Sequence, residues 1–380
     1  MKVKSEAAII GLGFVGKAHL EALRRLGVPV CGILGSSPDR TREAAAELGI
    51  ARAYSSLDEL ANDPVVTAVH ICSPNHVHYD QSKAALEAGK HVLCEKPLAM
   101  NTTESGTLVE LARKSKRVGA VAYNLRYYPL CHQARALVQQ GAIGEPRLIH
   151  GSFLQDWLLY PTDWNWRLQP ELGGEMRVVA DIGTHWMDLL TWITGKKVTE
   201  LCADLATVIP VRKRPRGRVQ TFQQTTGETD DFTVTTDDSA SILLNFEGGA
   251  HGVCTVSQIS AGRKTRLWFE IDGSEGSLSW NSEDPNTLWI GHRREPNQEL
   301  IKDPSLMSPE ARGYAAYPGG HAEGYPDTFV QLFKDFYAYL EAGDLSKTRT
   351  FPTFETGHEE MLLCDAIARS AKERRWVKLA

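Results

Sequence analysis

A glycine-rich turn near the start of the chain constrains its fold more than any other feature. The run IIGLGFVG at residues 9–16 follows an apolar stretch and precedes a helical pattern at residues 17–26. Gly11 permits a tight turn, Gly13 lets the backbone approach a bound group, and Gly16 lets helix and strand pack closely. Amides and the dipole at the helix N-terminus favour an anion such as a pyrophosphate. We therefore expect a strand-turn-helix unit that contacts a dinucleotide through Gly11, Gly13, Phe14, Val15 and Gly16.

Apolar runs and helical patterns alternate through the first third of the chain. The expected strands cover residues 7–10, 28–34, 68–72, 91–94 and 118–122. Helical patterns fall between them, including residues 40–48, 77–88 and 103–114. This alternation predicts an α/β Rossmann domain with a doubly wound parallel sheet, whose ligand lies beyond the carboxyl ends of the strands. We expect this NAD(P)-binding domain to cover residues 1–124.

The pattern changes after residue 124. A helical stretch at residues 128–140 precedes several strand-like runs, at residues 147–154, 201–208, 239–246, 249–258, 265–271 and 277–280. Glycine-rich turns between these runs predict antiparallel hairpins. Two late helices are expected near residues 327–342 and 356–372, and the last can pack on either domain. Residues 125–380 are thus expected to form an α+β domain with a large, mainly antiparallel open sheet that binds substrate and carries oligomer contacts.

Composition excludes several classes of protein. The 380 residues include seven cysteines without a CxxC pair, which predicts reduced thiols rather than disulfides or a zinc ribbon. We expect no signal peptide, no membrane span and a cytoplasmic location. The net charge of −5 argues against a nucleic-acid partner, and the basic run at residues 212–218 is expected to be a solvated hairpin loop within a mobile segment at residues 209–231. We expect no metal, since His76 and His78 lack further ligands at usual spacing.

Two short segments carry residues suited to proton and hydride chemistry. Lys96 follows an expected strand in the run CEKP, and Asp181 and His185 are four residues apart in the run DIGTH, so a helix would place both on one face. Histidine can remove a hydroxyl proton near neutral pH, Lys96 can stabilise the resulting alkoxide, and Asp181 can position either group. Alone, His185 could be a core histidine and Lys96 an exposed strand-end lysine. Their joint occurrence favours a reaction centre.

These segments together resemble one known family. The glycine run, Ser73-Pro74-Asn75 with His78, the EKP and DIGTH runs, the glycine pair at residues 173–174 and the run PTFETG at residues 352–357 are similar to the glucose-fructose oxidoreductase, inositol dehydrogenase and rhizopine catabolism (Gfo/Idh/MocA) family. The resemblance implies an NAD(P)-dependent dehydrogenase that acts on a hydroxyl of a sugar, sugar derivative or cyclitol. It implies that Lys96, Asp181 and His185 are catalytic. In this family the bond between such a lysine and the following proline is often cis, which the sequence alone cannot show for Lys96–Pro97.

The segment after the second strand bears on the choice of cofactor. An NAD enzyme usually places an acidic residue there, whereas NADP needs space and a cation. The run GSSPDR at residues 35–40 instead offers Ser36, Ser37 and Arg40 to a 2'-phosphate, which favours NADP over NAD. In the alternative, Arg40 is an ordinary helix residue and Asp39 reaches the ribose. Further cofactor contacts are expected from strand-end residues, namely Ser73, Asn75, His78, Glu95, Lys96 and Asn124.

Polar and aromatic residues outside these segments suggest a substrate wall. Arg126 follows the last strand of the first domain, Gln155 follows the first strand of the second domain, and Trp166 precedes the DIGTH run. Aromatic planes beside polar groups suit a pyranose or cyclitol, although such tryptophans can equally be core residues. The expected substrate contacts are Lys96, Arg126, Gln155, Trp166, Asp181 and His185.

Two alternative functions remain open on the sequence alone. One is an enzyme that oxidises and reduces its bound nicotinamide transiently, for hydrolysis or epimerisation without net redox change. The other is a nucleotide-binding sensor without turnover, against which the presence of all three catalytic residues argues. Whatever the function, an uncovered face of the predicted antiparallel sheet would favour a homodimer or homotetramer that buries it.

Overall fold

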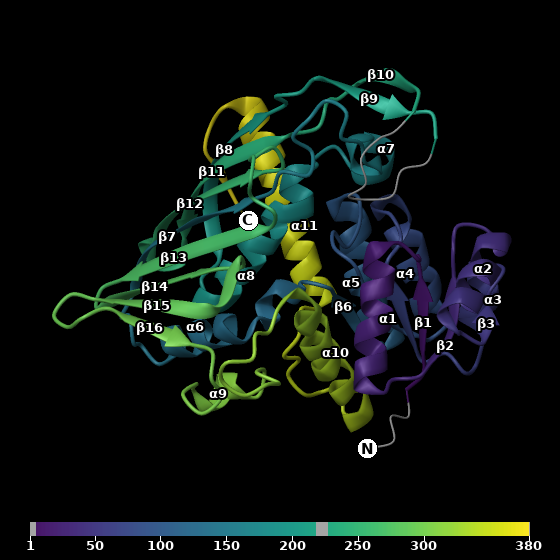
Figure 1. The fold of residues 1–380 in the computed structure, drawn as a ribbon, viewed down its shortest axis with the longest axis horizontal. Coiled ribbons are helices and arrows are strands. Elements are labelled where there is room, and N and C mark those ends of the chain that lie inside the picture. The colour runs from purple at the N-terminus through teal and green to yellow at the C-terminus, as the bar shows by residue number, and fades with distance from the viewer. Residues whose placement is uncertain (1–4, 218–226, 380) are drawn as a thin grey trace. The chain divides into compact units, whose positions relative to one another are not determined.

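The protein divides into two compact units in a computed structural model that describes residues 5–217 and 227–379 (Figure 1). The first unit comprises Met1–Asn124, Glu171–Gly174 and Pro326–Met361. The second comprises Leu125–Pro170, Glu175–Tyr325 and Leu362–Ala380. No helix in the described ranges is both long and apolar enough to cross a membrane.

The sheet of the first unit is parallel throughout. Its described strands are β1 (Ala7–Ile10), β2 (Val30–Leu34), β3 (Arg52–Ala53), β4 (Ala68–Ile71), β5 (His91–Cys94) and β6 (Gly119–Val121). They pair in the order β3-β2-β1-β4-β5-β6. The strand order reverses between β1 and β4, the switch point where an open α/β sheet binds its ligand. The predicted Rossmann sheet is confirmed, with the short strand β3 as an addition.

Helices cover this sheet and bury its apolar strands. They are α1 (Phe14–Leu26), α2 (Pro38–Leu48), α3 (Leu57–Asn62), α4 (His78–Glu87) and α5 (Thr102–Ser115). Helix α10 (Tyr325–Ala342) from Pro326 onward, and α11 (Phe354–Glu373) as far as Met361, also belong to this unit. Every residue of β1 and β4 is buried, as expected for a parallel sheet covered on both faces.

The second unit contains a larger mixed sheet. Its described strands are β7 (Pro146–Leu154), β8 (Val198–Ala206), β11 (Ser239–Phe246), β12 (His251–Ser257), β13 (Arg266–Gly273), β14 (Gly276–Asn281), β15 (Asp284–His292), β16 (Gln298–Ile301) and β17 (Val377–Lys378). The order is β16-β15-β14-β13-β7-β12-β11-β8-β17. Strands β7 and β12 run parallel, and the other described neighbours are antiparallel. The predicted, mainly antiparallel sheet is therefore confirmed.

Helices α6 (Pro129–Gln139) and α8 (Thr184–Thr194) pack on one face of this sheet (Figure 1). The burial of side chains along β7 shows that this face belongs to the core. Ile149 and Phe153 point into the core and are buried, whereas Leu148 points to the opposite face and is exposed. Trp186 of α8 donates a 3.0 Å hydrogen bond from Nε1 to the carbonyl oxygen of Trp268 in β13. A side chain at Gly151 would stand 2.7 Å from that indole nitrogen, so glycine is what lets α8 approach the sheet.

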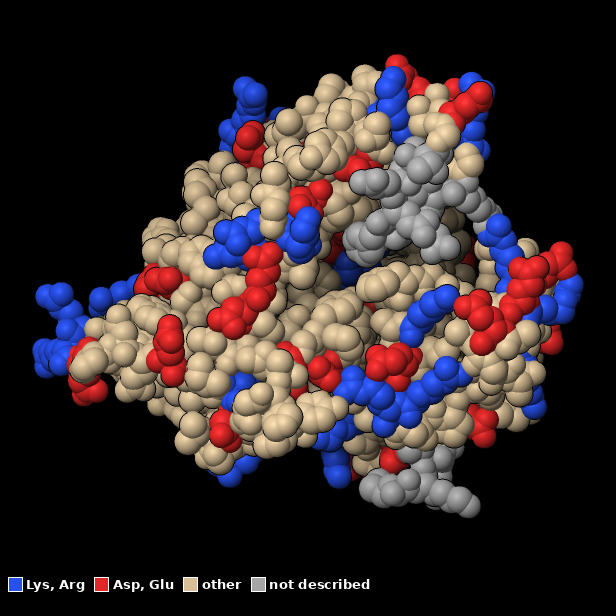
Figure 2. All heavy atoms as spheres, viewed as in Figure 1, with Lys and Arg blue, Asp and Glu red and all other residues tan. Residues whose placement is uncertain are grey.

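The basic run is expected to be a solvated hairpin loop, but most of it forms a strand of an antiparallel pair, and one of its arginines is buried. Strand β9 (Val211–Pro215) pairs with β10 (Thr229–Thr233) in a small antiparallel sheet, and residues 218–226 lie outside the described residues. Arg212 is fully buried and donates 2.9 Å hydrogen bonds to the carbonyl oxygens of Leu158 and Tyr160. The charge of Arg212 is compensated by the buried Asp238, whose Oδ1 accepts a 2.8 Å hydrogen bond from it. The exposed Arg216 pairs with Asp230 of the opposite strand at 2.9 Å. Figure 2 shows basic and acidic side chains interspersed over the face in view.

Short helical segments complete the two units. They are η1 (Asn75–Val77), η2 (Asn124–Tyr127), η3 (Trp166–Leu168), α7 (Pro170–Gly173), η4 (Val179–Gly183), η5 (Glu247–Gly249) and α9 (Pro309–Arg312). Segment η4 has π-helical hydrogen bonding and continues directly into α8. Such π-turns inside helices often occur at functional sites.

Candidate active site

Close backbone contacts explain two glycines of the first turn. Gly11 has φ of +91°, and a Cβ on it would stand 2.5 Å from the carbonyl carbon of Cys72 at the end of β4. A Cβ on Gly16 would stand 2.0 Å from the carbonyl oxygen of Gly11. Both distances are far below any real Cβ contact, so the turn and the start of α1 can adopt this geometry only with glycine.

Gly13 differs because its surroundings are open. Among the residues that the structure describes, nothing beyond its chain neighbours lies within 4 Å of a Cβ placed on Gly13. Gly13 is also the N-cap of α1 and, as a glycine, offers no side chain to cap that helix. Phe14, the first residue of α1, is exposed. A helix N-terminus beside open space fits a dinucleotide pyrophosphate, which would be held by Gly11, Gly13 and the first turn of α1.

The loop after β2 is closed by one threonine. The amide of Gly35 donates a 3.0 Å hydrogen bond to Oγ1 of Thr41, and this hydroxyl donates a 2.7 Å hydrogen bond to the carbonyl oxygen of Ser37. Ser36 and Arg40 are exposed at the rim of this loop. Asp39, the acidic alternative for a ribose contact, forms an ion pair with Arg42. The loop therefore presents hydroxyls and a guanidinium, while its carboxylate is engaged with a neighbour.

His78 joins the loops that follow β4 and β5. Its Nε2 lies 2.9 Å from the carbonyl oxygen of Ser73, and its Nδ1 lies 2.7 Å from that of Pro97. Burial lowers the pKa of His78, against the opposing effect of these two carbonyl contacts. The Lys96–Pro97 peptide bond is cis. His78 therefore holds the two loops together, and its contact with the cofactor stays a prediction.

The remaining strand-end candidates are also engaged within the first unit. Asn75 donates a 2.9 Å hydrogen bond to the carbonyl oxygen of Gly173. Asn124 donates a 2.7 Å hydrogen bond to Oγ1 of Thr328 in α10. Oγ of Ser73 lies 2.6 Å from Oε1 of Gln81. These bonds fix the side chains around the ends of β4, β5 and β6, where the sheet topology predicts the cofactor.

In the second unit, Asp181 lies in η4 and His185 in the first turn of α8, and both are buried. Two residues hold the Asp181 carboxylate. Gln258 donates a 2.7 Å hydrogen bond from Nε2 to Oδ2, and Nε of Arg167 lies 3.1 Å from Oδ1. Neither residue is among the site residues that the sequence predicts. Gln258 lies just beyond β12, so only the strand register places it beside Asp181.

Several residues of the expected substrate wall contact other side chains of the second unit. The guanidinium of Arg167 lies over the ring of Trp166, 4.4 Å from its centroid. Oε1 of Gln155 accepts a 2.7 Å hydrogen bond from Nε1 of Trp157. Arg126 donates a 2.7 Å hydrogen bond from Nε to Oδ2 of Asp188, one turn after His185 in α8. The Arg126–Asp188 pair is buried and holds α8 in place.

Gly183, between Asp181 and His185, packs against the core. A Cβ on it would stand 3.4 Å from Cγ1 of Val179 and 3.7 Å from Cγ1 of Val256 in β12. Both are ordinary packing distances in the core. Gly183 therefore lies on the side of the helix that packs against the sheet.

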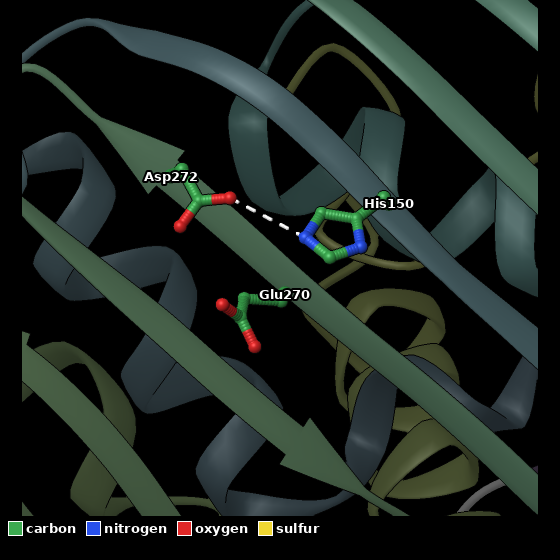
Figure 3. A group of neighbouring side chains, drawn as sticks. All are labelled: His150, Glu270 and Asp272. Carbon is green, nitrogen blue, oxygen red and sulfur yellow. Dashed lines mark ion pairs between the residues drawn. The ribbon is translucent and has the colours of Figure 1, made fainter.

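Three potential metal ligands meet on the outer face of the large sheet. His150 of β7 and Glu270 and Asp272 of β13 have ligand atoms within 4.8 Å of one another (Figure 3). His150 is the cross-strand partner of Glu270, and its Nε2 lies 3.3 Å from Oδ2 of Asp272. An ordinary cross-strand ion pair accounts for this group. It lies apart from η4 and α8, on the other face of the same sheet.

Comparisons with known proteins agree with this architecture. Residues 5–123 match the model of an oxidoreductase family with an NAD-binding Rossmann fold, and residues 131–279 match that of the GFO/IDH/MocA C-terminal domain. The chain is 31% identical to levoglucosan dehydrogenase of Pseudarthrobacter phenanthrenivorans over 97% of this chain and 96% of that protein. It is 27% identical to myo-inositol 2-dehydrogenase of Thermotoga maritima over 98% and 97% of the two chains.

Solved structures give the same result. The apo form of levoglucosan dehydrogenase matches with a TM-score of 0.91 and 30% identity, over 99% of this chain and 98% of that chain. An inositol dehydrogenase homologue from Azotobacter vinelandii, complexed with NAD+, matches with a TM-score of 0.86 and 27% identity, over 99% and 97%. Fold, glycine turn and relatives define a two-domain, nicotinamide-dependent dehydrogenase. The chain belongs to the Gfo/Idh/MocA family of oxidoreductases.

Proposed function

We propose that the protein oxidises a CH–OH group of a sugar, sugar derivative or cyclitol. The observation that carries the proposal is the buried Asp181 carboxylate, fixed by Gln258 and Arg167 one helical turn before His185. A carboxylate held in one place stabilises the protonated form of a neighbouring histidine and so helps that histidine to accept a proton. The levoglucosan and myo-inositol dehydrogenases among the relatives support a polyhydroxylated substrate.

We assign the chemistry to Lys96, Asp181 and His185, which act on the same substrate hydroxyl. His185 removes the hydroxyl proton, and Lys96 donates a hydrogen bond that stabilises the resulting alkoxide. Asp181, four residues before His185, influences the protonation of that histidine by its charge. The bound nicotinamide accepts the hydride from the carbon. Arg126, Gln155 and Trp166 form the rest of the proposed substrate wall.

We propose a preference for NADP over NAD. The loop after β2 has glycine where a ribose-binding acidic residue usually stands, and Asp39 is paired with Arg42. Ser36, Ser37 and Arg40 remain as hydrogen-bond donors and as a cation for a 2'-phosphate. Two relatives of known structure bind NADH or NAD+, so kcat/KM must be measured with both cofactors.

We also propose a homodimer, or a tetramer built from such dimers, formed through the outer face of the large sheet. Leu148, Leu243 and Ile301 on that face are 39%, 48% and 52% exposed. Exposed leucine and isoleucine side chains on a sheet face favour burial against a second copy. Leu243→Lys should shift the mass measured by light scattering toward the monomer, whereas Val208→Lys outside the sheet should not. The free cysteines are consistent with a reducing, cytoplasmic location.

A panel of sugars and cyclitols, assayed with NAD and NADP separately at the absorbance of the reduced nicotinamide, tests the function. We expect net reduction of the cofactor with at least one polyol. Product formation without net absorbance change would indicate transient internal redox chemistry. Tight nucleotide binding without any product would indicate a sensor. Either result would overturn the dehydrogenase proposal.

A further inference from the structure

A chain of four buried polar side chains runs through the first unit. Nε2 of His19 in α1 lies 3.1 Å from Oε1 of Glu95, which follows β5. Nδ1 of His19 lies 3.0 Å from Nδ1 of His70 in β4. Nε2 of His70 lies 2.9 Å from the hydroxyl of Tyr337 in α10. Both histidines are fully buried, and Tyr337 is buried as well.

Aromatic rings enclose the two histidines. The ring of Phe333 lies 4.7 Å from that of His19 and 4.8 Å from that of His70, measured between centroids. Phe329 also lies against His19, at 5.2 Å. Buried polar groups in such surroundings must satisfy one another, because water is excluded and an unmade hydrogen bond is costly. The positions of the protons along the chain can therefore be deduced.

One arrangement satisfies every atom. Glu95 is an acceptor at both oxygens, since Oε2 also accepts a 3.3 Å hydrogen bond from the backbone amide of Lys96. His19 must then donate from Nε2 and accept at Nδ1. His70 must donate from Nδ1 and accept at Nε2, where the Tyr337 hydroxyl donates. Both histidines are neutral in this arrangement, with opposite tautomers.

The reverse direction leaves a buried donor without an acceptor. If His19 donated to His70, then His70 would donate to the Tyr337 oxygen, and the hydroxyl proton would need another partner. In the described part of the chain, the Tyr337 hydroxyl has no other hydrogen-bond partner. Burial raises the pKa of Tyr337 and lowers that of His70 well below its usual range, so the hydroxyl keeps its proton and His70 stays neutral. Tyr337 thus sets the direction of the whole chain.

We propose that His19, His70 and Tyr337 are positioning residues that fix Lys96 through Glu95. The chain holds the Glu95 carboxylate in one orientation, and that carboxylate holds the amide of Lys96. It also connects this turn to α1, the helix that begins at the glycine turn. The effect on catalysis rests on the proposed role of Lys96, whereas the hydrogen bonds from Tyr337 to Glu95 are independent of that role.

Two tyrosines on α10 provide a matched test. Tyr337→Phe removes the hydroxyl that directs the chain, whereas Tyr339→Phe removes one that donates a 2.9 Å hydrogen bond to the carbonyl oxygen of Leu345. Wild-type nitrogen NMR spectra should show His19 protonated at Nε2 and His70 at Nδ1. Hydrogen exchange of the Lys96 amide should accelerate about three- to tenfold in Tyr337→Phe and remain unchanged in Tyr339→Phe. Neither measurement requires a substrate.

Turnover supplies the second readout. Tyr337→Phe should lower kcat about three- to tenfold with little change in the KM for either substrate, and Tyr339→Phe should leave both constants unchanged. A doubly protonated His19, the opposite tautomers, or equal exchange of the Lys96 amide in the two variants would overturn the inference. Equal kcat in the two variants would overturn its catalytic part. Normal turnover in Lys96→Ala would instead refute the proposed function and leave the exchange result standing.

Discussion

Nε of Arg167 lies 3.1 Å from Oδ1 of Asp181, and the same guanidinium lies over the ring of Trp166. The stacking holds Arg167 in one orientation, so the ion pair holds the carboxylate in place. With Gln258 on the other oxygen, Asp181 is a fixed acceptor. This geometry suits a residue that orients and polarises its neighbours, and it agrees with the base role that we propose for His185.

Replacing the proposed base or the proposed lysine should therefore abolish most of the activity. We expect Lys96→Ala and His185→Ala each to lower kcat on the order of a hundredfold or more, because general-base and alkoxide-stabilising effects are of this size. Nucleotide affinity should stay within a few-fold of wild type. Steady-state rates and nucleotide titration check both points, with the exposed Lys114→Ala as control. Near-normal turnover in either variant would remove that residue from the assignment.

The glycine turn permits a contrast between binding and folding. A side chain at Gly13 would enter open space, so Gly13→Val should retain the fold and the melting temperature but lose nucleotide binding. A side chain at Gly16 would collide with the Gly11 carbonyl oxygen, so Gly16→Ala should lower the melting temperature. Calorimetric titration and thermal unfolding distinguish the two. Unchanged nucleotide affinity in Gly13→Val would place the dinucleotide elsewhere.

Cofactor preference should depend on the rim of the loop after β2. Arg40→Ala should raise the KM for NADP about tenfold or more and hardly affect NAD, because a charge-assisted hydrogen bond to phosphate is lost. Gly35→Asp should shift the preference toward NAD, with some adjustment of Thr41, whose Oγ1 would lie 3.1 Å from the new Cβ. The exposed Lys114→Ala again serves as the control, because Arg42→Ala would release Asp39 from its ion pair. A wild-type preference for NAD in kcat/KM would refute the NADP proposal.

His91 should make stability depend on pH. Its Nδ1 accepts a 3.0 Å hydrogen bond from the amide of Val118, and burial, with a smaller effect of Arg117, lowers the pKa of His91 to about 4. Below the usual value of 6.5 the unfolded chain binds a proton that the folded chain does not. The contribution of His91 is therefore complete above pH 6.5 and is lost as the pH falls toward 4.

The variant His91→Asn isolates this effect, since an asparagine oxygen can accept from the same amide without titrating. Between pH 7 and pH 5 the free energy of unfolding should fall by about 2 kcal/mol less in His91→Asn than in wild type. Urea unfolding at the two pH values measures the difference. The same pH dependence in both proteins would mean that His91 titrates normally in the folded state.

Removal of metal ions should leave the enzyme unchanged. The proposed proton chemistry uses Lys96 and His185, and the His150 group is explained by its ion pair with Asp272. After dialysis against a chelator, turnover and melting temperature should both stay the same. A loss that zinc restores, and that His150→Ala makes permanent, would instead assign a metal to this group.

Much of the fold could be predicted because its signals are local. The apolar runs of β1, β5 and β11 coincide with the expected strands residue for residue, and the glycine turn identifies the start of α1. Strands β9 and β10 could not be predicted, because charged residues there replace the apolar alternation. Arg212 illustrates the reason: its burial depends on carbonyl groups of Leu158 and Tyr160, more than fifty residues away.

The candidate site shows the same limit. The motifs identify Lys96, Asp181 and His185 as candidates, since their residue types and spacing are unusual together. The residues that hold them come from distant parts of the chain, as Gln258 holds Asp181 across 77 positions and Tyr337 meets His70 across 267. No local pattern encodes such pairs, because register and helix packing create them.

The Thr41 hydroxyl that closes the loop after β2 has an evolutionary consequence. It binds only backbone atoms of Gly35 and Ser37, so the shape of the loop does not depend on the side chains at positions 36, 37 and 40. Those three positions can therefore be exchanged singly without refolding the strand or the helix beside them. A lineage could move from one dinucleotide to the other through functional intermediates, and the threonine is the position that it would have to keep.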